Sequence, residues 1–122
     1  MKVLFIGGTG NLSLPTSEEA LRQGIALTHI NRGNQALRLE GVETIVADGR
    51  DEVTLRGALA DRSFDTVVDF IAYGPPDVER AARLFAGKTA QYVFISSSSV
   101  YQKPPRSHVL TEGTPLENPY WK

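Results

Sequence analysis

The sequence has no cysteine among its 122 residues and only two histidines. The lack of cysteine excludes disulfide bonds and thiolate metal sites, and His29 and His108 lack the spacing of metal ligands, so we expect no metal site. The formal net charge is -1, without the positive excess typical of general nucleic-acid or anionic-membrane binders. No apolar run approaches the length of a membrane span, and the first residues predict a strand rather than a signal sequence. These absences favour a cytoplasmic protein without a membrane or nucleic-acid partner.

Short apolar runs alternate with helical patterns along most of the chain. Because these runs are continuous, they are typical of parallel strands that are buried on both faces. We therefore predict one α/β domain, a doubly wound parallel sheet of Rossmann type with strand order 3-2-1-4-5. The predicted strands are residues 2–6, 25–30, 43–46, 66–71 and 91–95, and the predicted helices are residues 12–23, 35–39, 51–60 and a segment that begins at Pro75-Pro76.

The helical periodicity predicts which side chains face the core. The predicted inward positions are Leu14 and Leu21 in the first helix, Leu55, Ala58 and Leu59 in the helix over residues 51–60, and Val78, Ala81, Ala82 and Phe85 in the last helix. From Ser96 to Lys122 the pattern gives way to loop residues, and no sixth strand follows. We interpret the chain as a Rossmann domain truncated at its C-terminus.

A glycine loop joins the first predicted strand to the first predicted helix. Gly7 and Gly10 hold the first two places of a Gly-x-x-Gly-x-x-Gly spacing, and Ser13 holds the third. The first glycine allows a tight turn, the second lets the backbone approach a pyrophosphate, and the helix N-terminus offers free N–H groups. The loop therefore predicts a dinucleotide-cofactor site, with candidate residues Gly7, Thr9, Gly10, Asn11 and Leu12.

The ends of the second and third predicted strands indicate how the cofactor is selected. Asn31-Arg32-Gly33 stands where a strict NAD binder would place a carboxylate, and Arg32 can form a charge-assisted fork with a 2′-phosphate. This favours NADP over NAD, and the alternative is a solvated turn arginine. Asp48 can accept a hydrogen bond from an adenine amino group while Gly49 leaves room for the base. The alternative is that Asp48 caps the next helix, a role that Asp51 can also take.

Ligands of an open parallel sheet bind beyond the carboxyl ends of its strands. The fourth predicted strand therefore places its last residues beside the pyrophosphate and the nicotinamide ribose: Phe70, Ile71, Ala72 and Tyr73. We interpret Asp69 as structural and His29 as a packed residue of the sheet. The serines after the fifth strand, Ser96–Ser99, are either a polar strand terminus or a source of a catalytic hydroxyl.

With these residues in place, the chain resembles the short-chain dehydrogenase/reductase superfamily, and more narrowly its branch of NAD(P)-dependent sugar epimerases and dehydratases. The resemblance rests on three stretches in order, which are residues 5–11, the pair Asp48-Gly49, and residues 93–101. It implies hydride transfer on a hydroxyl-bearing, nucleotide-sugar-like small molecule, with NADP or NAD as the cofactor. It also implies that residues 1–122 are an NAD(P)-binding domain without the C-terminal substrate-binding region.

The same resemblance implies that Ser96 contacts the cofactor, that Ser97 orients a substrate oxygen, and that Tyr120 is the general acid/base. Ser13 departs from the family's third glycine. The family's companion lysine would stand four residues after the tyrosine, beyond this chain, and Lys122 is too early to replace it. Without that cation a tyrosine is a poor base at neutral pH, so we expect this polypeptide to be inactive by itself.

Two other hypotheses stay open. The residues from Asp69 to Tyr73 also resemble an atypical branch that includes chloroplast stem-loop RNA-binding proteins, which suggests a non-catalytic dinucleotide sensor or RNA-associated relative. The net charge gives little support to RNA binding. The last hypothesis is a fragment that binds nothing and forms a homodimer through the edge of its fifth strand or through uncovered apolar surface.

Overall fold

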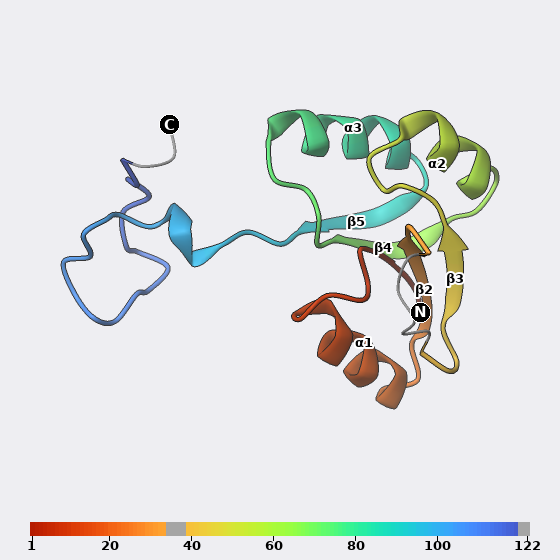
Figure 1. Cartoon of the computed structure of the whole chain (residues 1–122), viewed down its shortest axis with the longest axis horizontal. Coiled ribbons are helices and arrows are strands. Elements are labelled where there is room, and N and C mark those ends of the chain that lie inside the picture. The colour runs from red at the N-terminus through yellow and green to blue at the C-terminus, as the bar shows by residue number, and fades with distance from the viewer. Residues whose placement is uncertain (34–38, 120–122) are drawn as a thin grey trace.

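The computed structural model describes residues 1–33 and 39–119, and its strands form one parallel five-stranded sheet (Figure 1). The strands are β1 (Lys2–Ile6), β2 (Ala26–Asn31), β3 (Glu43–Val46), β4 (Phe64–Asp69) and β5 (Thr89–Phe94), and the helices of the described residues are α1 (Ser13–Arg22), α2 (Glu52–Leu59), α3 (Pro75–Phe85) and a short 3-10 helix (Ser98–Val100). The strand order β3-β2-β1-β4-β5 confirms the predicted topology. Residues 35–38 of the helix predicted for residues 35–39 lie outside the described residues, and Leu39 is not helical.

Helices cover the sheet on two sides, with α1 on one face and α2 and α3 on the other (Figure 1). Alternate side chains of β1 pack on opposite faces of the sheet. Leu4 and Ile6 belong to the cluster that includes the buried leucines of α2 and α3, whereas Val3 and Phe5 pack with Ala20 of α1. The central strand is therefore buried on both faces, as its continuous apolar run predicted.

The buried face of α1 differs from the predicted one. Its buried residues are Ser13, Ser17 and Ala20, whereas Leu14 and Leu21 are only half-buried. These small side chains let the backbone of α1 lie close to the sheet. The helix can therefore pack on the sheet without a stripe of large apolar residues. The prediction favoured the larger side chains because periodicity alone does not report how closely a helix approaches its neighbours.

In α2 and α3 the predicted core positions are mostly confirmed. The buried side chains of the two helices are Leu55, Leu59, Ala81, Leu84 and Phe85. The predictions for Ala58 and Ala82 are wrong, because both residues are exposed, and Val78 is half-buried. Leu84 is buried where the prediction had Ala82, because Ala81, Leu84 and Phe85 have the i, i+3, i+4 spacing of one helix face and Ala82 lies outside that stripe.

Strands β4 and β5 both begin two residues earlier than predicted. Phe64 pairs with Thr89 at the start of the two strands, and Asp69 pairs with Phe94 at their end. Phe70 and Ile71 consequently leave the ladder and belong to the loop that follows β4. This shift matters for the site, because it makes Asp69 the last strand residue.

After β5 the chain leaves the sheet, and its C-terminal segment lies apart from the helical layers (Figure 1). Backbone hydrogen bonds hold this segment together, from Gln102 N to the Pro115 carbonyl at 2.8 Å and from Lys103 N to the Glu117 carbonyl at 3.3 Å. None of the helices in the described ranges is long and apolar enough to cross a bilayer. β5 is an edge strand of this sheet, and a homodimer formed through it stays a prediction.

Candidate functional site

A pocket of about 300 Å³ opens at the carboxyl edge of the sheet, where the strand order reverses beside β1. Its walls come from the loops that follow β1, β2, β3 and β4. The lining residues are Gly7, Thr9, Gly10, Ile30, Asn31, Arg32, Asp48, Gly49, Arg50, Ile71 and Tyr73. Open α/β sheets bind their ligands at such a switch point, so this pocket is the candidate site.

Two wider hollows in the described part of the chain are weaker candidates. One, of about 530 Å³, lies at the opposite edge of the sheet, where Arg62 is already paired with Glu43 at 2.6 Å. The other, of about 590 Å³, lies among the C-terminal loops between residues 100 and 119. Neither contains the glycine loop or lies at the carboxyl ends of the strands.

Gly7 makes the tight turn that the sequence predicted. Its φ is +85°, and a Cβ atom at this position would lie 2.5 Å from Cγ2 of Ile71. Its amide donates to the Ile30 carbonyl at 2.9 Å, which ties the end of β1 to β2. A larger residue would therefore strain the backbone and displace Ile71 from the wall of the pocket.

The Ser13 hydroxyl is integrated into the glycine loop. It accepts a hydrogen bond from Gly10 N at 2.8 Å and donates one to the Gly7 carbonyl at 2.8 Å. Ser13 is also 2% exposed, so the side chain fits the close helix packing that a third glycine would allow. Ser13, which stands in place of the third glycine, thus stabilises the loop through two hydrogen bonds within it.

The start of α1 leaves backbone donors for a ligand. Leu12, at the N-cap position, makes no side-chain capping bond. Within the described ranges, no hydrogen-bond partner satisfies the amides of Thr9, Asn11 and Leu12. The side chains of Asn11 and Leu12 are exposed outside the pocket lining, so these two residues can serve it through their backbone alone. Free amides at a helix N-terminus favour an anion.

His29 supports the glycine loop from below and is a packed residue, as predicted. Its ring is 2% exposed, stacks on Phe5 with centroids 5.8 Å apart, and lies 2.9 Å from Ser17 Oγ through Nε2. A Cβ atom on Gly8 would lie 2.5 Å from this ring. The second glycine of the Gly7-Gly8 pair is therefore required by the core, a constraint that sequence reasoning missed.

Protonation of His29 is expected to destabilise the fold at mildly acidic pH. Burial lowers the pKa of His29, whereas the unfolded chain has an ordinary histidine pKa of about 6.5. The stabilisation is therefore complete above about pH 6.5 and is lost as the pH falls toward the folded-state pKa. Denaturant unfolding between pH 7.5 and 5 should show a falling free energy of unfolding, with a slope of at most about 1.4 kcal/mol per pH unit.

The matched pair for this test is His29→Gln and His108→Gln. His108 is exposed, so its variant should keep the wild-type slope, whereas His29→Gln should flatten it. The carboxyl groups of Glu43 and Asp77 have lowered pKa values through bonds from Arg62 and from the Tyr73 amide, so their titration falls at lower pH. An unchanged slope in His29→Gln would contradict the assignment.

Arg32 lies exposed at the carboxyl end of β2 and lines the pocket. A strict NAD binder would have a carboxylate here to accept from the ribose hydroxyls. The Asn31 side-chain oxygen is a poor substitute, because Oδ1 already accepts a hydrogen bond from Gly33 N at 3.1 Å. In the described ranges, ion pairs with carboxylates occupy Arg22, Arg56, Arg62, Arg80 and Arg83. Arg32 and Arg50 form none there, and both line the pocket, so the site keeps positive charge for a ligand.

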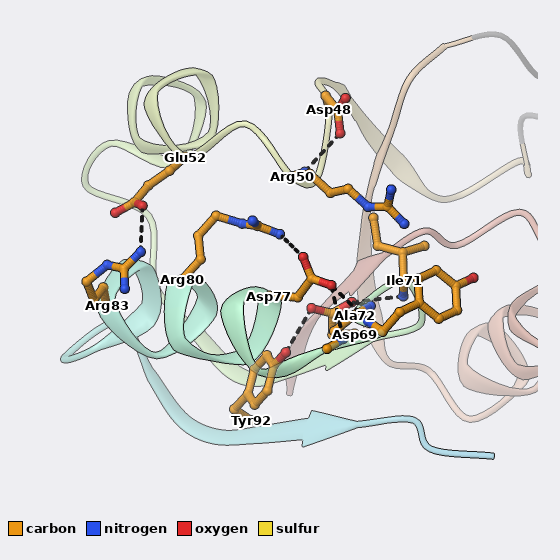
Figure 2. Close-up of polar contacts among 12 residues, drawn as sticks. Asp48, Arg50, Glu52, Asp69, Ile71, Ala72, Asp77, Arg80, Arg83 and Tyr92 are labelled. Carbon is orange, nitrogen blue, oxygen red and sulfur yellow. Dashed lines mark hydrogen bonds and ion pairs between the residues drawn. The ribbon is translucent and has the colours of Figure 1, made fainter. Parts of the chain in front are cut away.

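Asp48 is not the cap of α2. Asp51 takes that role, because its Oδ1 accepts from Val53 N and Thr54 N at 3.1 Å, and hydrogen bonds from Thr54 lower the pKa of its carboxyl. Asp48 instead turns the loop by accepting from Arg50 N at 2.9 Å and lines the pocket (Figure 2). The capping alternative for Asp48 is therefore wrong.

Gly49 has a packing reason as well as the predicted steric one. A Cβ atom here would lie 2.7 Å from the side chains of both Ile6 and Ile71. The glycine thus lets the β3–α2 loop approach β1 and the β4–α3 loop. The role of Gly49 in leaving room for a base stays a prediction.

Two aspartates fix the β4–α3 loop (Figure 2). Asp69, 5% exposed, accepts from Ile71 N at 2.9 Å and Ala72 N at 3.0 Å through Oδ1, and from the Tyr92 hydroxyl at 2.8 Å through Oδ2. Burial, together with the hydrogen bond to Asp69, raises the pKa of Tyr92, which keeps its hydroxyl a donor. Asp69 is therefore structural, as predicted.

Asp77 completes the same loop from the first turn of α3. Its Oδ2 accepts from Tyr73 N at 2.9 Å and from Gly74 N at 3.2 Å, and its Oδ1 accepts from Arg80 at 2.7 Å. The loop amides are thus occupied by the chain's own carboxylates. What the loop offers a ligand is the side chains of Ile71 and Tyr73.

Several predicted site residues lie outside the pocket lining. The Phe70 ring packs edge-on against Phe5 with centroids 5.1 Å apart, and Ala72 is buried. Ser96 and Ser97 lie exposed in the loop after β5, where Ser97 Oγ accepts from Ser99 N at 3.2 Å. Tyr120 lies outside the described residues. No metal-ligating group of three His, Asp or Glu side chains gathers within the described ranges.

Sequence reasoning missed Ile30 and Arg50 as lining residues. Ile30 carries no chemical signal, because a buried aliphatic residue at a strand end looks like any core position. Arg50 had a weak signal, since it directly follows the Asp48-Gly49 pair in the same loop.

The fold of this chain is similar to the folds of several solved proteins, two epimerases among them. The UDP-glucose 4-epimerase from Bifidobacterium longum, in complex with NAD+ and UDP, superposes with a TM-score of 0.82 at 23% identity over 98% of this chain and 44% of that chain. The UDP-Glc/GlcNAc 4-epimerase from Campylobacter jejuni superposes with a TM-score of 0.80 at 16% identity, over 95% of this chain and 43% of that chain. A short-chain dehydrogenase/reductase superfamily protein from Agrobacterium tumefaciens with bound NAD superposes with a TM-score of 0.66 at 24% identity, over 95% of this chain and 39% of that chain.

These similarities confirm the predicted resemblance at the level of the fold. The chain spans 39–44% of the length of these three proteins. No protein-family model matches the sequence, and no curated protein matches it significantly. The class that fold and site define is thus a parallel α/β domain with a ligand pocket at its switch point.

Proposed function

We propose that residues 1–122 form the dinucleotide-binding domain of an NAD(P)-dependent epimerase, dehydratase or reductase. The observation that carries the proposal is the pocket at the switch point, lined by the glycine loop, a carboxylate and two arginines that form no ion pair within the described ranges. The Bifidobacterium and Agrobacterium proteins, which share the fold, are both complexes with NAD. The substrate would be a hydroxyl-bearing, nucleotide-sugar-like small molecule.

The residues present fit a dinucleotide. The amides of Thr9, Asn11 and Leu12, which have no hydrogen-bond partner among the described residues, would hold the pyrophosphate, and a Cβ atom on Gly7 would push Ile71 out of the pocket wall. Asp48 Oδ2 has no hydrogen-bond partner among the described residues, so it can accept from the amino group of a base. The donor set thus matches a ligand with an anionic centre and a nucleotide base at one end.

The bound nicotinamide would supply hydride-transfer chemistry at a carbon that bears a hydroxyl. In such an enzyme, Ser97 would orient the substrate oxygen and Tyr120 would move the hydroxyl proton. Ser97 follows β5 in an exposed loop, so its hydroxyl can be approached by a substrate. The phenol would need a nearby cation to act at neutral pH, since its ordinary pKa is about 10.

Arg32 is proposed as the group that selects NADP. No carboxylate stands at Asn31-Arg32-Gly33 to accept a hydrogen bond from a ribose 2′-hydroxyl, and the Asn31 side-chain oxygen already accepts one from Gly33 N. A 2′-phosphate would instead meet the guanidinium of Arg32, which forms charge-assisted paired hydrogen bonds with phosphate. The same residue gives NAD no comparable partner.

Calorimetric titration of the 122-residue chain with NADP+ and with NAD+ tests this proposal. We expect NADP+ to bind at least about tenfold tighter, which corresponds to about 1.4 kcal/mol. Arg32→Ala should abolish the preference, whereas Arg106→Ala should keep it, because Arg106 is exposed and lies outside the pocket lining. Equal binding of both nucleotides would refute the role of Arg32, and binding of neither would refute the dinucleotide site.

A further inference from the structure

Arg50 and Tyr73 meet at the pocket although they belong to different loops. Arg50 lies between β3 and α2, Tyr73 lies between β4 and α3, and the Arg50 Cζ atom lies 5.5 Å from the centroid of the Tyr73 ring. Both residues line the pocket, and Tyr73 is 78% exposed. The Tyr73 ring is therefore open to a ligand that enters the pocket.

Both partners of this contact are positioned by backbone bonds. The Arg50 amide donates to Asp48 Oδ1 at 2.9 Å, and the Tyr73 amide donates to Asp77 Oδ2 at 2.9 Å. Asp77 is held in turn by Arg80, as Figure 2 shows. The contact therefore joins two anchored loops.

The Arg50 guanidinium keeps capacity for a ligand. It forms no ion pair within the described ranges, whereas Arg56 of α2 and Arg83 of α3 both pair with Glu52. Guanidinium groups stack on planar π systems and are weakly hydrated, so one face can rest on an aromatic ring while the other receives a second ring. Asp48, two residues earlier, marks the end of the pocket that would receive the base.

We infer that Arg50 and Tyr73 form a stacking wall that holds the nucleotide base at the Asp48 end of the pocket, which assigns Tyr73 to the base and not to the nicotinamide ribose expected from the sequence. This inference rests on the proposed function, since it names residues that recognise one part of the proposed ligand. The wall contributes to affinity for the base and adds nothing to the choice between NADP and NAD, which lies with Arg32. Its two members act together, because the Arg50 guanidinium rests over the Tyr73 ring.

The first test uses the 122-residue chain and its variants with ADP and with nicotinamide mononucleotide, by calorimetry. Arg50→Ala and Tyr73→Ala should each weaken ADP binding about two- to fivefold, the range expected for an exposed cation–π contact. The double variant should bind ADP as the weaker single variant does, because the two side chains act together. Binding of nicotinamide mononucleotide should be unchanged in all of them.

Two matched variants control for charge and for the hydroxyl. Arg106→Ala removes an exposed arginine outside the pocket and should bind ADP like the wild type. Tyr73→Phe keeps the ring under Arg50 and should also keep the affinity. Both altered side chains are exposed, so the variants are expected to fold, which equal thermal unfolding midpoints would verify.

A second ligand pair separates stacking on the base from contact with phosphate. Adenosine and inorganic pyrophosphate can be titrated separately by chemical-shift perturbation. The stacking wall predicts that Arg50→Ala weakens the binding of adenosine and leaves the binding of pyrophosphate unchanged. The reverse result would overturn the inference. Wild-type affinity for ADP in both alanine variants would also overturn it while leaving the proposed function intact. A wild-type chain that binds no ADP, NADP+ or NAD+ would refute both.

Discussion

Asp69→Ala is expected to lower the free energy of unfolding by about 3–5 kcal/mol, a large part of the stability of a small domain. The carboxylate accepts three hydrogen bonds at a position that is 5% exposed, from Ile71 N, Ala72 N and the Tyr92 hydroxyl. Alanine would leave these three donors without a partner inside the protein. Each buried donor left unsatisfied costs about 1–3 kcal/mol, reduced by local relaxation. Chemical denaturation followed by far-ultraviolet circular dichroism measures the loss.

Two milder variants show which of these bonds matters. Tyr92→Phe removes one donor and is expected to cost about 1–2 kcal/mol. Asp69→Asn keeps an oxygen for the two amides and presents an N–H to the Tyr92 oxygen, so it should cost less than the alanine variant. An Asp69→Ala protein within about 1 kcal/mol of the wild type would contradict the assigned role. Since Asp69 orients Ile71 in the pocket wall, the alanine variant should also bind nucleotide more weakly.

The sheet could be predicted from the sequence because each strand carries its own signal, a short continuous run of apolar residues. Continuous apolar runs such as Val3–Ile6 require burial on both faces, and a parallel sheet with helical crossovers provides that burial. The strand order follows from the same connections. The two-residue error in β4 arose because Phe64 belongs to the ladder through its pairing with Thr89, which is a long-range contact.

The candidate site was only partly predictable for a related reason. The glycine loop, Arg32 and Asp48 carry chemical signals in fixed places along the chain, and the pocket brings them together. The pairing of Arg50 with Tyr73 depends on two loops that are distant in sequence. No spacing rule connects those residues, so only the folded chain reveals their contact.

The small-residue face of α1 shows the same limit. Leu14 and Leu21 have the periodicity of a core stripe, but Ser13, Ser17 and Ala20 are the buried residues. Ser17 on that face lies 2.9 Å from Nε2 of the buried His29 in β2, through its hydroxyl oxygen. Apolar periodicity does not report such a polar contact between a helix and the sheet, so the buried face was not predicted.

Gly8→Ala is expected to destabilise the protein by about 2–3 kcal/mol and to abolish nucleotide binding. The added methyl group would lie 2.5 Å from the His29 ring. That ring cannot withdraw easily, because it stacks on Phe5 and bonds to Ser17. The glycine loop would have to move instead, which would displace the amides proposed to hold the pyrophosphate. Denaturant unfolding and calorimetry with NADP+ measure the two losses.

Gly10→Ala and Gly57→Ala are the matched controls, and together they separate packing from ligand binding. A Cβ atom on Gly10 would meet only Ser13 Oγ at 3.5 Å, so Gly10→Ala should keep the stability and still weaken NADP+ binding, since the backbone there must admit the pyrophosphate. Gly57 lies in α2 with nothing within 4 Å of such an atom, so Gly57→Ala should stabilise the helix by about 0.5–1 kcal/mol. Full NADP+ affinity in Gly10→Ala would mean that the glycine loop does not approach the ligand, whereas full stability in Gly8→Ala would mean that the His29 ring yields to the methyl group.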